Sequence, residues 1–529
     1  MEAVRIFLES QAILTLFLVI GLGYALGEVN LRGLSFGVGA VLFVGLVVGI
    51  LAPAAAPPPL LQTVGLVLFF YGIGIQYGRQ FFTGLVSPSG LRQNLLAMVS
   101  LAVGVLVTLG LFFSGTAIDY VTGQFAGALV STGALQAALE ATGSTNPSIG
   151  YSVSYPLGVF APILVIYLAL RLIRPALLPP EGAGYTTLEL DVRRPEVIGQ
   201  TVAEVAKRLP AGVQIAAIQR LGINTIPQPT TRFVEGDDVL VIGSANVIEG
   251  AREVFGPVIE PVILEHPQGL EYLRVFVSRP AVVGRTIAEL RISETLGASV
   301  VNLRRGDAEL HARPSLALET GDRIGLMTQR SNFPTVRTFF GNSMRSTAEV
   351  SYVSLGIGIV LGVLLGMIAV PVPGLGKISL GLAGGPLLMA LILGRLRRTG
   401  PLTWVLPPTA NLVLRTFGLT LFLAVVGMRS GPAFAQTIQS QGLTLLLGGM
   451  VVTLAVVVTA IIVGHFVMRM PFDELLGVAS GVTGNPAILA FAGRSVPTDK
   501  PDVGYAITFP SMTIVKILIV QVLAAVFRT

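Results

Sequence analysis

Apolar runs near 20 residues long constrain this chain more than any other feature of its sequence. A helix of about 20 apolar residues spans the hydrocarbon core of a bilayer. The runs occupy residues 11–27, 36–52, 60–77, 95–114, 152–173, 350–371, 378–395, 409–428, 442–468 and 503–527. We therefore expect a polytopic α-helical membrane protein with five spans in each half.

Two further apolar stretches, 122–141 and 475–492, are interrupted by Gly, Thr, Ser, Asn or Pro. Irregular backbone at membrane depth is tolerated only where it is buried in protein or lines a cavity. These stretches are therefore predicted to be re-entrant hairpins, one in each half.

Composition supports a membrane protein and narrows its chemistry. The chain is 52% hydrophobic and 12% charged, with a mean hydropathy of +0.77, whereas soluble domains are about 25% charged. Without Cys, and with only three scattered His, we expect no metal centre, no cofactor and no enzymatic activity. Lys and Arg on cytoplasmic loops account for the net charge of +6 without nucleic acid as a partner.

Between Arg174 and Arg345 charged residues become frequent and apolar runs shrink to strand length. This change in composition and in the length of the apolar runs predicts a soluble α/β insert. Its short apolar runs are 188–190, 213–218, 239–242, 273–277 and 299–303. The expected domains are a membrane repeat at 1–175, soluble lobes at 181–260 and 261–345, and a second membrane repeat at 346–529.

Lys and Arg in short loops set the orientation, because they favour the cytoplasmic side. With both termini outside, the outer side holds Arg5, Lys377, Arg429 and Arg528. The inner side then holds Arg32, Arg79, Arg92, Arg171, Arg174, Arg345, Arg395, Arg397, Arg398, Arg469, Arg494 and Lys500. This bias predicts a cytoplasmic insert.

The two membrane halves resemble each other. Residues 61–82 match 414–435 at an offset of 353, with identical Gly, Thr and Phe as well as Leu. Thr132-Gly133 meets Thr483-Gly484 at an offset of 351. Five spans per half give the halves opposite senses in the membrane, so we expect an inverted repeat. Secondary transporters with such repeats bind substrate near the midplane.

The insert repeats at an offset of 85, where IGQTVAEV (198–205) matches VGRTIAEL (283–290). Two similar lobes suggest a pseudo-symmetric regulatory pair, and an inert spacer is the alternative. The Gly-Asp pairs at 236–237 and 321–322 predict turns. Two such lobes could form a ligand cleft between them. No Walker or Rossmann glycine motif identifies a nucleotide as the ligand.

The broken segments carry a resemblance to a known family. They read GALVSTGALQAALEA (127–141) with GYSVSYPLGVF (150–160), and GVASGVTGNPAILAFAG (477–493) with GYAITFPSMTIVKILI (504–519). Over nearly its whole length the chain resembles the aspartate–alanine exchanger family of bacterial transporters. That family often has Thr-x-Thr-Pro in the first hairpin, where this chain has Ser-Thr-Gly-Ala at 131–134, so the carried acid stays open. The lobes resemble C-terminal ligand-binding modules of potassium-conductance regulators.

A carboxylate that leaves water at membrane depth needs new partners, such as backbone N–H groups at helix N-termini, hydroxyls and cations. The broken segments and the following helix have residues of these types. The candidate substrate-binding residues are Ser131, Thr132, Gly133, Tyr155, Thr483, Gly484, Asn485, Pro486, Ser511, Thr513 and Lys516. Close helix packing through small residues is the alternative for the Gly, Ser and Thr positions.

Lys516 lies well inside an apolar span, where a charge is expensive and usually faces a cavity. It is expected to neutralise a substrate carboxylate; the alternatives are a buried carboxylate partner or snorkelling to the interface. Arg429 ends another span and is a candidate gate or anion-attracting residue, with an interfacial anchor as the alternative.

The sequence thus predicts an antiporter of small carboxylates such as aspartate, alanine or succinate, in the bacterial cell membrane. The broken repeats favour an elevator-type mechanism, with a homodimer as the expected assembly. A ligand-gated ion channel is the alternative, suggested by the lobes, although no potassium-filter motif is present. A membrane enzyme ranks last.

Overall fold

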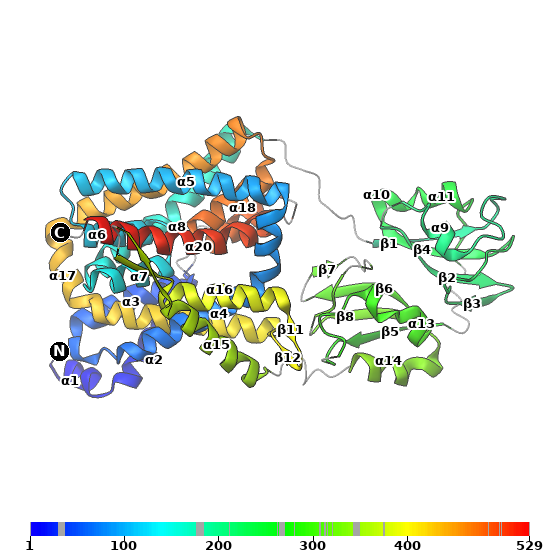
Figure 1. The fold of residues 1–529 in the computed structure, drawn as a ribbon, viewed down its shortest axis with the longest axis horizontal. Helices are drawn as coiled ribbons and strands as arrows, with labels where there is room; N and C mark the ends of the chain where they lie inside the picture. The colour runs from blue at the N-terminus through cyan, green and yellow to red at the C-terminus, as the bar shows by residue number, and fades with distance from the viewer. Residues whose placement is uncertain are drawn as a thin grey trace. The chain divides into compact units, whose positions relative to one another are not determined.

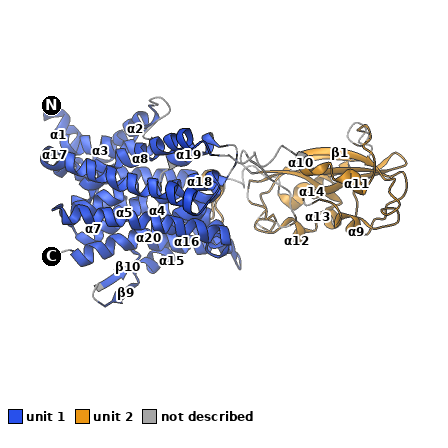
Figure 2. Ribbon diagram, turned by 90° about the horizontal axis from the view of Figure 1, so that it is seen from above, with its two compact units in different colours: residues 1–179, 352–404, 411–529 blue, residues 180–351, 405–410 orange. Residues whose placement is uncertain are grey.

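The computed structural model describes residues 2–527 except 30–36, 176–184, 211, 262, 264–269, 280, 306–307, 311–313, 315, 320, 342–349, 374–375, 485, 497 and 499. The chain forms two units (Figure 2). The first, a helical unit, comprises 1–179, 352–404 and 411–529. The second comprises 180–351 and 405–410 and contains the lobes.

The first half of the helical unit runs from α1 to α8 (Figure 1). Its helices are α1 (Glu2–Ser10), α2 (Ala12–Glu28), α3 (Ala40–Leu51), α4 (Pro59–Val86), α5 (Pro88–Phe113), α6 (Ile118–Ala128), α7 (Thr132–Thr142) and α8 (Asn146–Ile173). The boundary between α4 and α5 follows from local chemistry. Ser87 caps α5 by accepting the N–H of Gly90, and Pro88 occupies the first helical position, where its missing N–H costs nothing.

The second half runs from α15 to α20. Its helices are α15 (Tyr352–Met367), α16 (Gly381–Leu396), α17 (Pro408–Ile462), α18 (Phe472–Thr483), α19 (Pro486–Ser495) and α20 (Lys500–Phe527). Short hairpins β9–β10 (Ala369–Val372, Gly376–Ser379) and β11–β12 (Arg398–Thr399, Leu402–Thr403) flank α16. A π-helical turn, Val463–Val467, follows α17.

The helices match the predicted spans unevenly. Among the described residues, five helices are long and apolar enough to cross a membrane, or up to six if the bent pair α1–α2 counts as one span. The apolar helices around α3, α15 and α16 are shorter; at about 1.5 Å per residue, a 16-residue helix covers about 24 Å, less than the roughly 30 Å core. The predicted spans 409–428 and 442–468 are joined, because α17 continues through Pro432.

Each predicted hairpin is a pair of short helices. Helices α6 and α7 occupy the first stretch and α18 and α19 the second. Each pair packs on the long helix that follows it, α6 on α8 and α18 on α20 (Figure 1). The broken segments are therefore enclosed by other helices, as irregular backbone in a membrane requires.

Helices α4 and α17 meet at two glycines. A Cβ added at Gly65 would lie 2.5 Å from the carbonyl oxygen of Gly418, and one added at Gly418 would lie 2.5 Å from that of Gly65. Such closeness requires glycine on both helices. The contact is reciprocal, and the two residues correspond at the offset of 353 seen in the sequence.

The soluble unit contains two four-stranded antiparallel sheets of the same topology, with orders β1-β4-β2-β3 and β5-β8-β6-β7. Their strands are β1 (Tyr185–Asp191), β2 (Gln214–Arg220), β3 (Ile223–Thr225), β4 (Asp238–Ser244), β5 (Glu271–Phe276), β6 (Ala298–Arg305), β7 (Ala308–Leu310) and β8 (Arg323–Thr328). Both sheets carry a bulge at the same position, between 215 and 217 and between 300 and 302. The predicted duplication of the insert is therefore visible in its strands.

Details within the lobes repeat at the same offset. Thr201 and Glu204 form a capping box at the start of α9 (Val202–Ala206), as Thr286 and Glu289 do for α12 (Ile287–Leu290). The predicted Gly-Asp turns are also present: Asp237 accepts the N–H of Val234 at 2.9 Å, and Asp322 accepts that of Glu319 at 2.7 Å.

Candidate functional site

The break in the first half lies between α6 and α7. After Leu129 the chain turns through Val130, whose φ of +47° is unusual for a β-branched residue. Ser131 then caps α7, and its hydroxyl accepts the N–H of Ala134 at 3.3 Å. The remaining N–H groups of the first turn of α7 give this end of the helix a positive potential.

The break in the second half lies between α18 and α19. Gly484 ends α18 with a φ of +74°, a left-handed conformation that glycine adopts without strain. Helix α19 begins at Pro486, since proline suits the first turn of a helix. Asn485 lies outside the described residues.

The side chain of Lys516, on α20, contacts the chain at both helix breaks. Its side chain is fully buried, and its Nζ donates to the carbonyl oxygen of Val482 at 2.8 Å and to that of Leu129 at 3.4 Å. These carbonyls belong to the C-terminal ends of α18 and α6, where the helix dipole favours a cation. The ammonium is thus held where both broken helices end.

A cavity of about 200 Å³ adjoins Lys516. Helices from both halves line it, and the wall is largely aromatic or aliphatic. Its polar lining residues are Tyr77, Ser131, Thr132, Tyr151, Tyr155, Arg415, Tyr505, Thr513 and Lys516. At about 30 Å³ per water, the volume corresponds to about seven water molecules, which suits a metabolite of a few carbon atoms.

The structure brings many of the predicted residues together around this cavity. The predicted residues in its wall are Ser131, Thr132, Gly133, Tyr155, Gly484, Thr513 and Lys516. Thr483 and Ser511 are absent from the described wall, and their hydroxyls donate to carbonyls of their own helices. Arg429 is exposed on α17 and is likewise absent from it.

Sequence reasoning missed Arg415, which lines the cavity from α17. It is half-buried, donates to Oε1 of Gln76 at 2.5 Å and interacts with the Tyr77 hydroxyl. The sequence could have identified it, because Arg415 lies inside the predicted span 409–428, and an ionisable residue within a membrane span suggests a functional role. The same criterion identified Lys516.

The aromatic part of the wall comes from both halves of the helical unit. Tyr505 stacks on Phe509 with ring centroids 4.9 Å apart, and Tyr151 lies 5.4 Å from Tyr155. The Tyr151 hydroxyl is buried and has no hydrogen-bond partner among the described residues. It is therefore available to a ligand in the cavity.

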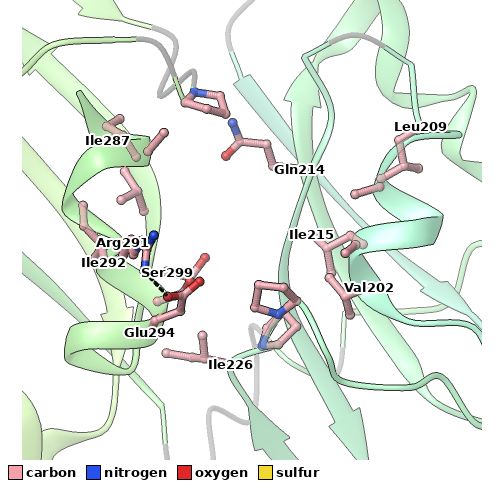
Figure 3. A pocket seen from close by; sticks show the side chains of 18 of the residues that line it. Val202, Leu209, Gln214, Ile215, Ile226, Ile287, Arg291, Ile292, Glu294 and Ser299 are labelled. Carbon is pink, nitrogen blue, oxygen red and sulfur yellow. Dashed lines mark ion pairs between the residues drawn. The ribbon is translucent and has the colours of Figure 1, made fainter.

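A second cavity, of about 960 Å³, lies between the two lobes of the insert (Figure 3). Its wall contains residues that correspond at the offset of 85: Val202 with Ile287, Ala203 with Ala288, Gln214 with Ser299, Ile215 with Val300, and Pro229 with Pro314. The charged residues of its wall are Arg291 and Glu294, whose Nη1 and Oε2 atoms lie 3.9 Å apart. The cavity is mostly apolar and pseudo-symmetric.

The two lobes also contact each other directly. Nε2 of Gln228 in the first lobe donates to the carbonyl oxygen of Ser293 in the second at 3.0 Å. Ala217 and Leu240 share an apolar cluster with Met327 of the second lobe. A ligand between the lobes would therefore contact both.

Comparison with known proteins identifies the family. The sequence profile described as "Predicted Permease Membrane Region", Asp-Al_Ex, matches residues 15–171 and 354–525. The chain belongs to this family, the aspartate–alanine exchanger family. The profile of the TrkA-C domain matches twice, at 189–256 and 272–341, which confirms two related lobes of this type.

Relatives in the exchanger family match this chain end to end. A protein of Geobacter sulfurreducens described as an uncharacterized transporter is 38% identical, over 98% of each chain. Similarly described transporters of Symbiobacterium thermophilum and Corynebacterium efficiens are 37% and 35% identical, over 98% of this chain and 99% of theirs. The solved RCK domain of GsuK covers 36% of this chain and 72% of its own, at 14% identity and a TM-score of 0.16.

These comparisons establish the broad class. The chain is a multi-pass membrane protein of a transporter family with two TrkA-C domains in its middle.

Proposed function

We propose that this protein is a secondary active antiporter of small carboxylates, such as aspartate, alanine or a dicarboxylate like succinate. The observation that carries the proposal is the position of Lys516, buried beside the cavity with its Nζ on the carbonyls of Leu129 and Val482. A cation held at membrane depth beside a cavity is a site for an anion.

The surroundings of Lys516 suit a carboxylate. The two helix C-termini help offset the cost of burying the ammonium, so the side chain need not pair with a protein carboxylate. Residues at the N-terminal end of α7, including Thr132 and Gly133, line the same cavity. An anion there would gain backbone N–H groups as well as the ammonium.

An inverted repeat would explain why two broken segments meet at one cavity. Support comes from the reciprocal contact of Gly65 and Gly418 and from the equivalent packing of α6 on α8 and α18 on α20. Inverted repeats place the substrate site at their interface and allow the two halves to exchange conformations.

An elevator motion is the mechanism we favour. The hairpins with α8 and α20 would move as one body against a scaffold that includes α3, α4, α16 and the first part of α17. The contact between α20 and α4 would be the sliding surface, and the scaffold would also form the homodimer. Structures in two states that showed the hairpins fixed on α4 would contradict this mechanism.

The insert would regulate transport. Its two TrkA-C domains enclose a cavity of about 960 Å³, large enough for a nucleotide-sized ligand. The Lys and Arg distribution favours a cytoplasmic insert and external termini, in a bacterial cell membrane.

Uptake into proteoliposomes tests the role of Lys516. We expect Lys516→Met to lower uptake of labelled succinate, aspartate or alanine at least about tenfold, since a charged hydrogen bond is worth about 1.5–3 kcal/mol and about 1.4 kcal/mol is tenfold. Ser511→Ala, on the same helix but outside the cavity wall, is the matched control. Equal uptake by the two variants would refute an anion site at Lys516.

A ligand-gated channel is the second candidate, because TrkA-C domains are also the type found in potassium-conductance regulators. A channel would pass current in planar bilayers without any acid on the opposite side. Such currents, together with uptake indifferent to the trans acid, would favour the channel.

A further inference from the structure

Arg415 contributes a second cation to the cavity, from a different element than Lys516. It lies on α17 and donates to Gln76 of α4. In the proposed elevator both helices belong to the scaffold, whereas Lys516 on α20 moves with the substrate. Arg415 would therefore face the substrate in only one of the two end states.

The internal repeat gives Arg415 and its partner counterparts in the other half. At the offset of 353, Arg415 corresponds to Gln62 and Gln76 corresponds to Arg429. At each of these two pairs of positions, α4 has a glutamine and α17 has an arginine. The reciprocal contact of Gly65 with Gly418 lies on the same two helices and follows the same offset.

The two counterpart pairs differ in this structure. Arg415 is half-buried in the cavity wall on Gln76. Arg429 is exposed and is not part of the described wall, and Gln62 instead donates to Oε1 of Gln136 on α7 at 3.0 Å. One arginine therefore faces the site while its counterpart does not.

As the hairpins move along the scaffold, alternating access brings the substrate site to one side of the membrane and then to the other. The site would then adjoin the pair of Arg415 and Gln76 in one end state and the counterpart pair of Arg429 and Gln62 in the other. We propose that Arg415 and Arg429 alternate as the scaffold cation of the substrate site, one in each end state. This inference rests on the proposed function and goes beyond it in assigning a state to each arginine.

In this proposal one cation of the anion site, Lys516, is the same in both end states, and the second cation differs between them. Lys516 accompanies the substrate through the cycle, and one arginine meets it on each side of the membrane. From the Lys and Arg bias, Arg415 serves the cytoplasmic side and Arg429 the outer side. Each state then holds two cations near the cavity, which favours a substrate with two carboxylates.

The test compares half-saturation concentrations of labelled succinate at the two membrane faces, in proteoliposomes of known orientation. Arg415→Gln should raise the ratio of the cytoplasmic to the outer value, and Arg429→Gln should lower it, each about tenfold. Arg398→Gln is the matched control, since this exposed arginine donates to the carbonyl of Gly400 outside the cavity wall. A ratio unchanged by Arg429→Gln, or shifted in one direction by both variants, would overturn the proposal.

A second measurement keeps both arginines in place. The chain contains no Cys, so the variants Gln76→Cys and Gln62→Cys each carry one reactive thiol. We expect a membrane-impermeant maleimide to modify the thiol at position 76 only from the cytoplasmic side and the thiol at position 62 only from the outer side. Modification of both from one side would overturn the assignment of the Arg415 pair to the cytoplasmic side and the Arg429 pair to the outer side.

Failure of this inference is distinguishable from failure of the proposed function. If the wild-type protein shows no saturable uptake of succinate, aspartate or alanine, the carboxylate antiporter is refuted. The maleimide pattern needs no transport and decides whether positions 62 and 76 are reached from opposite sides of the membrane.

Discussion

At the scale of single residues, Lys516 shows which features the sequence predicts and which it does not. Its position inside an apolar run predicted a buried functional charge, and the structure buries it completely. Its partners were not predictable, because one lies 34 residues away and the other 387 residues away on a different broken segment. Both are backbone carbonyls, which no side-chain pattern marks.

The acidic end of β4 in the first lobe provides a prediction about pH. Burial raises the pKa of Asp238, and the neighbouring carboxylates of Asp191, Glu189 and Asp237 raise it further. Because the folded pKa lies above the unfolded value, ionised Asp238 destabilises the fold at neutral pH, and this penalty fades as the pH falls through the raised pKa.

Asp238→Asn should therefore raise the thermal midpoint of the purified protein at pH 7, and the gain should shrink toward pH 4. The measurement is a pair of melting curves at the two pH values. Glu235→Gln, an exposed neighbour, is the control and should change little. A gain that is the same at both pH values would rule out this explanation.

Gly484 supports a prediction at the second helix break. Its φ is +74°, and an added Cβ would lie 3.3 Å from the Phe509 ring and 3.5 Å from Nζ of Lys516. Gly484→Ala should cost about 1–2 kcal/mol through the left-handed conformation alone and should impair uptake. Gly493→Ala, where the added Cβ meets open space, should retain both stability and uptake. Equal behaviour of the two variants would show that position 484 does not require the left-handed conformation.

At the scale of elements, the apolar pattern located most helices but not all of their ends. The broken segments were recognisable, because Gly, Ser and Thr interrupt them at 131–133 and 483–484. The continuity of α17 was not, since residues 429–441 include Pro432 and several polar residues that suggest a loop. Packing against neighbouring helices overrides such local signals.

The contact between α4 and α17 gives a prediction about packing. Gly418→Ala would place a methyl group 2.5 Å from the Gly65 carbonyl oxygen, and overpacking of this kind costs about 1–3 kcal/mol. We expect a lower melting temperature in detergent. Gly110→Ala on α5, with nothing within 4 Å of the added Cβ, is the control. If both variants melt at the wild-type temperature, the two helices are not in close contact.

At the scale of the whole molecule, duplication was the most informative signal in the sequence. The offset of 85 predicted two equivalent lobes, and the strands, bulges and capping boxes repeat accordingly. The cavities were less accessible to prediction, because residues far apart in the chain line each of them. Arg415 illustrates the difference: its place inside an apolar span marked it as unusual, but only the tertiary structure brings it to the same cavity as Lys516.

The proposed orientation is testable because the chain has no Cys of its own. The substitution Leu221→Cys places a thiol at an exposed turn of the insert, and Lys377→Cys places one on β10. In intact cells an impermeant maleimide should label the thiol at position 377 at once and the thiol at position 221 only after permeabilisation. The reverse pattern would invert the topology.

The central claim is exchange of small carboxylates, and counterflow tests it most directly. Proteoliposomes are loaded with unlabelled aspartate, alanine or succinate, and the uptake of labelled acid from outside is followed. We predict uptake that is faster with internal acid than without it and that overshoots its final level. Uptake at the same rate with and without internal acid would contradict an antiporter.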